Sequence, residues 1–281
     1  MHSRRDFLRT SGMVAIGSVL LKDLSAASNR KTAKDVGLQL YTVRTEMLAD
    51  NIGTLKKIAG LGYKEIESAG SEKGNYYGLK PAEMKKITKD LGMTLRSGHV
   101  HFDDKWQQTI DDAAEAGQEY VIVSSMPTKG QTVDNYKNVA ESFNKAGEAS
   151  EKSNLHFGYH NHDFEFEKEN GKILYDVLVE NTNPEFVNLE MDLGWVVVTG
   201  NDPLNYFAKY PGRFPLWHLK DMNLVEKHST EFGKGGLDVK KMLQNSEKAG
   251  MKYFFVEQEE YSVSALDCLE YNINYLKKLN Y

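Results

Sequence analysis

Short β-rich runs and longer segments with helical periodicity alternate eight times along this chain of 281 residues. The β-rich runs cover residues 36–43, 63–68, 93–102, 120–126, 155–166, 187–198, 214–222 and 253–259. The helical segments cover residues 51–59, 81–91, 106–116, 133–153, 173–181, 203–210, 237–249 and 264–279. Strict alternation of β and α elements is typical of a parallel sheet, and eight units of about 31 residues predict a closed (β/α)8 barrel. An open sheet is disfavoured because no G-x-G-x-x-G string follows the first run.

Turn signals agree with this division of the chain. Glycines stand where four of the helical segments should end, at Gly62, Gly92, Gly117 and Gly250. The alternating segment 164–172 contains Asn170-Gly171, a two-residue hairpin signal, so we expect a short ribbon above the fifth strand. We find no Pro-, Gly- or Ser-rich linker within residues 28–281 and predict one domain there.

The first 27 residues have the pattern of an export signal. Arg4-Arg5 precede Phe7-Leu8, an apolar stretch of about ten residues follows, and small residues end the segment at Ala27. The paired arginines resemble the twin-arginine signal, which carries folded proteins across the bacterial inner membrane. We therefore expect cleavage after Ala27 and a periplasmic protein. Ten apolar residues are too few for a permanent membrane span.

Titratable side chains cluster at the ends of the β-rich runs, which is where (β/α)8 barrels carry their active sites. Side chains two positions apart on a strand share a face, so His160 faces the same way as His162, and His218 the same way as Lys220. The other polar strand ends hold Glu65 and Glu67, His99 and His101, Glu190 and Asp192, and Glu257 and Glu259. Such a cluster is expected to surround a cation or a polar ligand, because unpaired buried charges are costly.

Imidazole and carboxylate ligands together suit Mn²⁺, Co²⁺, Zn²⁺ or Fe²⁺ better than Ca²⁺. A rim of Glu67, Glu259 and Lys220 joined by ion pairs, without metal, is the alternative explanation. The single cysteine, Cys268, excludes a multi-cysteine metal site and is expected to be a buried small hydrophobic residue in the last helix.

Four strings make the chain resemble the sugar phosphate isomerase/epimerase family, a group of xylose isomerase-like TIM barrels. The strings are Phe157-Gly-Tyr-His-Asn-His-Asp-Phe-Glu-Phe166, Met191-Asp-Leu-Gly-Trp195, Trp217-His-Leu-Lys-Asp221 and Val256-Glu-Gln-Glu259. The resemblance implies a divalent metal held by His160, Asp192, His218 and Glu257. Epimerase members have a glutamate at the position of His160, so the resemblance does not imply symmetric epimerisation by two glutamates. In this chain either His160 or His162 could be the metal ligand on the fifth strand.

The resemblance implies a metal-dependent sugar isomerase or epimerase that removes a proton next to a carbonyl or hydroxyl. His162 or Glu257 would take the proton, and Lys220 would either stabilise the resulting oxyanion or bind a substrate hydroxyl. The expected substrate contacts are Tyr41, Glu67, His99, His101, Trp195 and Glu259. A lyase, dehydratase or hydrolase of 3-keto-glycosides on the same metal site is the alternative, and a non-catalytic periplasmic carbohydrate-binding barrel is another.

Charge argues against nucleic acid as a partner. The whole chain carries a formal charge of −5, and removal of the leader, with four basic and two acidic residues, changes this to −7. A phosphodiester hydrolase similar to endonuclease IV is therefore disfavoured. The string Gly233-Lys234-Gly235-Gly236 is either a phosphate-binding loop or, more simply, a flexible turn. A small sugar or glycoside is the expected partner, and a homo-oligomer is compatible with the sequence.

Overall fold

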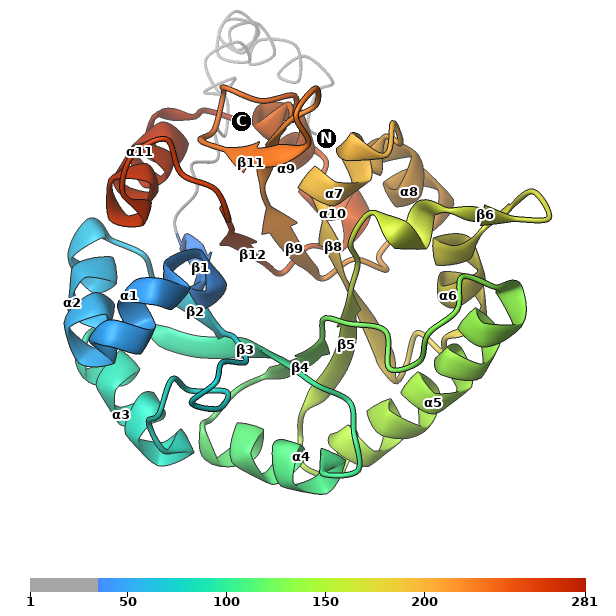
Figure 1. The fold of residues 1–281 in the computed structure, drawn as a ribbon, viewed down its shortest axis with the longest axis horizontal. Helices are drawn as coiled ribbons and strands as arrows, with labels where there is room; N and C mark the ends of the chain where they lie inside the picture. The colour runs from blue at the N-terminus through green and yellow to red at the C-terminus, as the bar shows by residue number, and fades with distance from the viewer. Residues whose placement is uncertain (1–34) are drawn as a thin grey trace, which may run out of the picture. The chain divides into compact units, whose positions relative to one another are not determined.

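The computed structural model describes residues 35–281, which form a closed barrel of eight parallel strands (Figure 1). The strands follow one another around the barrel in the order β1-β2-β3-β4-β5-β8-β9-β12, and β12 pairs back with β1. Their bounds are Gly37–Gln39, Glu65–Ser68, Thr94–Val100, Tyr120–Val123, His156–His160, Val187–Asp192, Leu216–Leu219 and Tyr253–Val256. The predicted (β/α)8 barrel is confirmed.

Helices surround the strands, from α2 in blue to α11 in red (Figure 1). They are α2 (Asn51–Leu61), α3 (Pro81–Asp90), α4 (Trp106–Glu115), α5 (Val133–Glu151), α6 (Leu174–Asn181), α8 (Pro203–Lys209), α9 (Val239–Gln244), α10 (Ser246–Ala249) and α11 (Ala265–Lys278). Segment 237–249, predicted as one helix, is divided at Asn245 into α9 and α10. The ring closes where Lys277 Nζ donates a hydrogen bond to the Leu61 carbonyl, 3.1 Å away. Within residues 35–281, no helix is long and apolar enough to cross a membrane.

Several strands are shorter than the β-rich runs predicted. The run 36–43 ends as a strand at Gln39, because the Gln39 side chain accepts a hydrogen bond from the Tyr41 N–H and starts a 3₁₀ helix, η1 (Leu40–Val43), which leads into α1 (Arg44–Ala49). Runs 120–126, 214–222 and 253–259 also leave the barrel before their predicted ends.

The run 187–198 changes from strand to helix in its middle. Asp192 ends β8, and its carboxylate accepts a hydrogen bond of 2.9 Å from the Trp195 N–H, which caps α7 (Leu193–Val198). The cap outweighs the β propensity of the valines in this helix. Asp192 therefore marks the end of β8, caps the start of α7 and faces the barrel axis.

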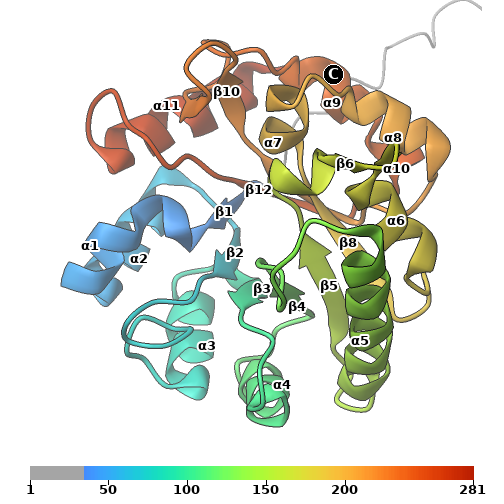
Figure 2. The same cartoon turned by 45° about the vertical axis from the view of Figure 1, so that its right-hand side comes forward.

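Two hairpins stand outside the barrel sheet (Figure 2). The expected ribbon is confirmed as β6 (Lys168–Glu169) paired with β7 (Lys172–Ile173), and Asn170 and Gly171 take φ angles of 50° and 79° in its turn. The segment before it, predicted as part of the ribbon, is instead a 3₁₀ helix, η2 (Phe164–Phe166). A second hairpin, β10 (Asp221–Asn223) with β11 (His228–Thr230), was not predicted.

An apolar plug fills one level of the barrel. Tyr120, Ile122, Leu216 and Phe255 form a separate buried cluster although they come from β4, β9 and β12, so their side chains meet inside the barrel. Because strand side chains alternate, the residues two positions beyond Leu216 and Phe255 face the same interior. These residues are His218 and Glu257, so the apolar plug supports a polar layer at the carboxyl ends of the strands.

Candidate metal centre

The polar layer brings together the four ligands implied by the resemblance. His160, Asp192, His218 and Glu257 each offer a ligand atom, and these four atoms lie within 4.8 Å of one another. His160 Nε2 and His218 Nδ1 both lie 3.9 Å from Asp192 Oδ2. All four residues are buried, and they stand at the ends of β5, β8, β9 and β12.

The chemistry of these donors fits a divalent metal ion. Two imidazoles and two carboxylates supply mixed nitrogen and oxygen ligands, as Zn²⁺, Mn²⁺, Co²⁺ and Fe²⁺ accept. Asp192 Oδ2 is completely buried and accepts no hydrogen bond of good geometry. The Lys220 ammonium lies 2.9 Å from this oxygen, so the fit to a metal rests on the four converging donor atoms, which could bind one.

Lys220 provides a permanent positive charge beside the ligand atoms. Its Nζ lies 2.9 Å from Asp192 Oδ2, 2.8 Å from Glu257 Oε2 and 2.7 Å from Glu259 Oε1, and the side chain is 0% exposed. Burial lowers the pKa of Lys220, but the three carboxylates outweigh it and raise this pKa well above its ordinary value. The metal-free alternative was a rim of Glu67, Glu259 and Lys220 joined by ion pairs. The Lys220–Glu259 pair of that rim is present next to the four candidate ligands.

A second group of polar side chains lies against the other side of the two histidines. His99, His160, Glu190 and His218 also offer ligand atoms within 4.8 Å of one another. His99 Nε2 is 2.7 Å from Glu190 Oε2, and Glu67 Oε1 is 2.6 Å from His218 Nε2. We call Glu67, His99 and Glu190 the floor carboxylate–histidine group. Glu190 was expected in the polar cluster because it shares the inward face of β8 with Asp192, but no separate role was predicted for it. Gln39, which contacts Glu67, was not predicted as a site residue.

Burial keeps His160 and His162 neutral. Burial, and next the neighbouring His218 and His99, lower the pKa of His160 well below its ordinary value. Burial and the charge of Lys220 lower the pKa of His162 to about 4. Both imidazoles therefore keep a lone pair at neutral pH.

Glu165 orders the turn that carries His162, a role that the sequence did not suggest. Its carboxylate accepts hydrogen bonds from the His162 N–H at 2.9 Å and from the Tyr159 hydroxyl at 2.5 Å. Burial raises the pKa of Glu165 to about 7, although the hydrogen bonds oppose this rise. Because Glu165 belongs to η2 rather than to an exposed ribbon, its side chain is fully buried under the site.

The residues expected to contact substrate differ in their positions. Trp195 lies with its ring 5.0 Å from Lys220 Nζ, and Glu259 pairs with the same ammonium. Tyr41 is 38% exposed beneath the Arg44 guanidinium, and His101 lines a separate cavity of about 410 Å³ between the loops after β2 and β3. Within the part of the chain that the structure describes, no hydrogen bond joins either the Tyr41 or the His101 side chain to the ligand cluster.

The glycine-rich string does not have free N–H groups for a phosphate. The Asp221 carboxylate accepts hydrogen bonds from the N–H groups of Gly233 at 2.8 Å, Gly235 at 3.0 Å and Leu237 at 2.9 Å. It also accepts one from Met222 at 3.0 Å. An internal anion thus fills the loop. Cys268 is fully buried in α11, as its surroundings in the sequence predicted.

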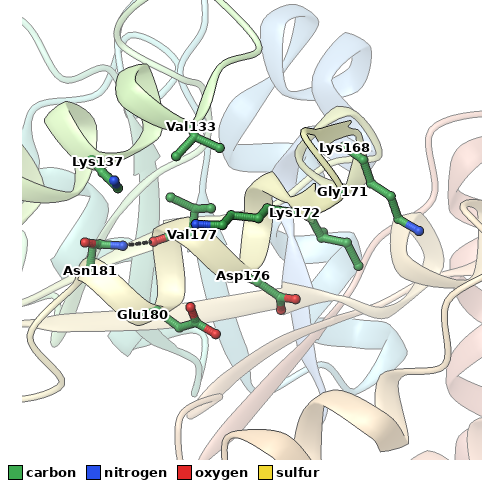
Figure 3. A pocket seen from close by; sticks show the side chains of 10 residues that line it. Val133, Lys137, Lys168, Gly171, Lys172, Asp176, Val177, Glu180 and Asn181 are labelled. Carbon is green, nitrogen blue, oxygen red and sulfur yellow. Dashed lines mark hydrogen bonds between the residues drawn. The ribbon is translucent and has the colours of Figure 1, made fainter.

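Another cavity lies on the outside of the barrel, beside α5, α6 and the β6–β7 hairpin (Figure 3). It has a volume of about 370 Å³, and its rim carries Lys137, Lys168 and Lys172 on one side and Asp176 and Glu180 on the other. None of its lining residues belongs to the ligand cluster or to the floor carboxylate–histidine group.

Known proteins with similar sequences or structures include lyases and isomerases. Inosose dehydratase of Clostridium tetani is 34% identical over 91 residues, which are 32% of this chain and 30% of that protein. Inosose dehydratase of Geobacillus thermodenitrificans is 26% identical over 243 residues, covering 72% of this chain and 81% of that protein. A solved sugar phosphate isomerase/epimerase from Parabacteroides distasonis superposes with a TM-score of 0.78 and is 29% identical, covering 88% of this chain and 99% of that one.

The family comparison covers most of the chain. Residues 55–279 match the family described as xylose isomerase-like TIM barrel, and this range runs from within α2 to the last residues of the chain. The matched segment contains all four ligands of the candidate metal centre and the whole floor carboxylate–histidine group. The chain belongs to the xylose isomerase-like TIM barrel family.

Proposed function

We propose that this protein is a divalent-metal-dependent enzyme that removes a proton next to the carbonyl of a keto-sugar or cyclic keto-polyol. The observation that carries the proposal is the buried set His160, Asp192, His218 and Glu257, with the neutral His162 beside it. A metal bound there would polarise the substrate carbonyl or hydroxyl and stabilise negative charge on its oxygen.

The residues of the chain have separate roles in this reaction. His162 accepts the proton from the carbon, because its imidazole is neutral at physiological pH. Lys220 directs its three N–H donors at carboxylates, so it would donate a hydrogen bond to the oxygen that gains negative charge once Asp192 and Glu257 bind the metal instead. The Trp195 ring beside Lys220 offers an apolar surface to the C–H face of the substrate and limits the access of water.

Elimination is the outcome that we favour. After His162 takes the proton, the C–O bond on the neighbouring carbon breaks and its electron pair stays with the leaving oxygen. The proton held by His162 is then transferred to this oxygen, which departs as water or an alcohol. This chain has His160 at the strand-5 position where a two-glutamate epimerase has one of its glutamates. The relatives named inosose dehydratases are lyases. Isomerisation is the second candidate, because the similar solved structure from Parabacteroides distasonis is named a sugar phosphate isomerase/epimerase.

We also propose a location for this reaction. The twin-arginine pattern of residues 1–27, which lie outside the described residues, supports export to the periplasm. A phosphorylated substrate is disfavoured there, and the Asp221 carboxylate already uses the N–H groups of the glycine-rich loop. Free keto-polyols and 3-keto-glycosides are therefore the first substrates to examine.

The deciding experiment combines metal analysis with product analysis in D₂O. Purified protein is loaded with Mn²⁺, Co²⁺ or Zn²⁺ and incubated with keto-inositols and 3-keto-glycosides, with His218→Ala as the matched inactive control. Elimination releases water or alcohol and gives an unsaturated ketone, whereas isomerisation loses neither and gives an isomer that is heavier than the substrate only by the solvent deuterium it carries. Wild-type protein that binds no divalent ion at micromolar metal contradicts the proposal. Metal and sugar binding without turnover would identify a carbohydrate-binding barrel instead.

A further inference from the structure

Carboxylates from different strands hold both ring nitrogens of His218. Its Nε2 lies 2.6 Å from Glu67 Oε1, near the end of β2, and its Nδ1 lies 2.8 Å from Glu257 Oε2, beyond β12. The imidazole is 0% exposed. A rotation of the ring would break both contacts inside a buried site, so the two carboxylates determine which nitrogen faces which side.

Glu67 is itself fixed from behind. Gln39 Nε2 donates a hydrogen bond of 2.8 Å to Glu67 Oε1, the same oxygen that contacts His218. The other end of the Gln39 amide is occupied, because its Oε1 accepts the Tyr41 N–H at 3.0 Å. The amide therefore cannot turn over without losing two hydrogen bonds, and its NH₂ group must face Glu67.

We propose that Glu67 is a positioning residue that holds His218 with Nδ1 aimed at the metal and with Nε2 carrying the ring proton. This inference rests on the proposed metal-dependent function. Only Nδ1 faces Asp192 and Glu257, so Nδ1 is the nitrogen that joins these two carboxylates in a ligand set. Nε2–H then donates to Glu67, because ligating histidines are oriented by a carboxylate on their second nitrogen. Glu67 thus acts through His218 and not by touching substrate.

The competing arrangement uses the other face of the same ring. In the set of His99, His160, Glu190 and His218, the nitrogen of His218 would be Nε2, which is 3.4 Å from Glu190 Oε2. A neutral imidazole cannot donate Nε2–H to Glu67 and bind a metal through Nε2 at the same time. The two arrangements therefore exclude each other for one ion, and the 2.6 Å contact with Glu67 favours Nδ1 as the ligand.

The ring nitrogens can be observed directly. Full-length protein labelled with ¹⁵N and loaded with diamagnetic Zn²⁺ is examined by two-bond ¹H–¹⁵N correlation of the histidine rings, with His218→Gln to assign the signals. We expect His218 to show a metal-bound Nδ1 and a protonated, slowly exchanging Nε2. A metal-bound Nε2 overturns the proposal and identifies the deeper set as the metal site.

Metal affinity gives the second test. Glu67→Gln should bind Mn²⁺ about 10- to 100-fold more weakly than wild type while keeping Nδ1 of His218 as the ligand. Gln39→Leu keeps the Glu67 carboxylate but removes the hydrogen bond that orients it, so this variant should show a smaller loss of Mn²⁺ affinity. It also tests the inference if Glu67→Gln does not fold. Glu231→Gln, which changes a buried carboxylate outside the site, is the matched control and should bind Mn²⁺ like wild type.

The outcomes separate this inference from the proposed function. If wild type binds Mn²⁺ and both Glu67→Gln and Gln39→Leu bind it equally well, Glu67 does not position His218 and the inference is wrong. If wild type itself binds no divalent ion, the proposed function fails first, before any comparison of variants. A loss of affinity in Glu231→Gln equal to that in Glu67→Gln also contradicts the inference, because it indicates a general effect of stability.

Discussion

Lys220 shows how much one buried ammonium can contribute to such a site. It is 0% exposed and pairs with Asp192, Glu257 and Glu259, so its removal takes the ammonium partner away from three carboxylates, two of them buried. We expect Lys220→Met to destabilise the metal-free protein by about 3 to 5 kcal/mol. Urea unfolding in the presence of a chelator measures this loss. Lys234→Met removes a half-exposed partner of Glu231 and should cost about 1 kcal/mol or less. Equal losses in the two variants would contradict this account of Lys220.

His162 makes the reaction depend on pH in a defined direction. Its pKa is lowered to about 4, so the imidazole loses its proton as the pH rises through that value and is a base at all higher pH. We expect kcat to rise with pH up to about 4 and then to stay level until another group titrates. An acid limb centred near pH 6.5 would show that burial does not govern this histidine.

Replacement of His162 should separate catalysis from metal binding. We expect His162→Gln to lower kcat by about 10²- to 10⁴-fold, the usual effect of losing a general base. Its metal content, measured by elemental analysis, should equal that of wild type, because His160 and not His162 belongs to the set of ligand atoms within 4.8 Å. Loss of the metal in this variant would instead assign the strand-5 ligand to His162.

At the scale of elements, Asp221 ties the β10–β11 hairpin to the glycine-rich loop. Its carboxylate accepts four backbone hydrogen bonds, and a Cβ at Gly235 would come within 2.6 Å of the Met222 carbonyl oxygen. We expect Asp221→Ala to lower the free energy of unfolding by about 3 kcal/mol, because it leaves buried N–H donors without acceptors. Asp221→Asn, which keeps one acceptor oxygen, should lose less. Thermal unfolding that is unchanged in Asp221→Ala would contradict this role.

Glu231 links the same region to Ser262, in the loop before α11, and makes stability depend on pH. Burial raises its pKa, but hydrogen bonds from Ser262 and Thr230, with the ion pair to Lys234, outweigh burial and lower it to about 2. Because the folded-state pKa is depressed, the stabilisation is present above about pH 4.5 and is lost as the pH falls toward 2.

We expect Glu231→Gln to cost about 2 kcal/mol at pH 7 and progressively less below pH 4.5. Urea unfolding of both proteins between pH 2.5 and 7 measures the difference in stability. A difference that grows as the pH falls would have the wrong sign for a depressed carboxylate pKa.

The elements themselves were predicted better than their ends. The periodicity of eight runs indicated the barrel, because hydrophobic alternation does not depend on distant partners. The change from strand to helix at Asp192 could not be read from periodicity, since Val196, Val197 and Val198 continue a pattern typical of strands while a local cap makes them helical. The hairpin of β10 and β11 has no Asn-Gly or Asp-Gly signal and was missed.

The candidate site was predictable to the extent that it lies on strand ends. His160, Asp192, His218 and Glu257 were identified because they interrupt β-rich runs and match family strings. Gln39 was missed because its partner Glu67 is 28 residues away and an uncharged amide at a strand end has no distinctive signal. The burial of Glu67 and Glu165 depends on side chains that only the closed barrel brings together.

At the scale of the whole molecule, export through the twin-arginine route would require that the barrel is folded first. We expect Arg4→Lys combined with Arg5→Lys to keep the protein in the cytoplasm with its leader uncleaved, because the paired arginines are the recognised feature of such signals. Cell fractionation and the mass of the purified chain measure this effect. Equal amounts of the wild-type protein and the double variant in the periplasm would contradict the assignment of residues 1–27 as a twin-arginine signal.

The two contacts of His218 have a consequence for how the barrel closes. The first and last strands of the described chain, β1 and β12, meet at a seam where Gly37 stands opposite Phe255. The imidazole of His218 reaches Glu257 at one side of this seam and Glu67, in β2, at the other. It therefore joins the second strand of the barrel to the end of the last strand, across β1. A metal ion bound by Glu257 and His218 would stabilise this connection. Backbone amide hydrogen exchange in β1 and β12 should therefore slow on metal binding more than amide exchange in β4, which lies across the barrel.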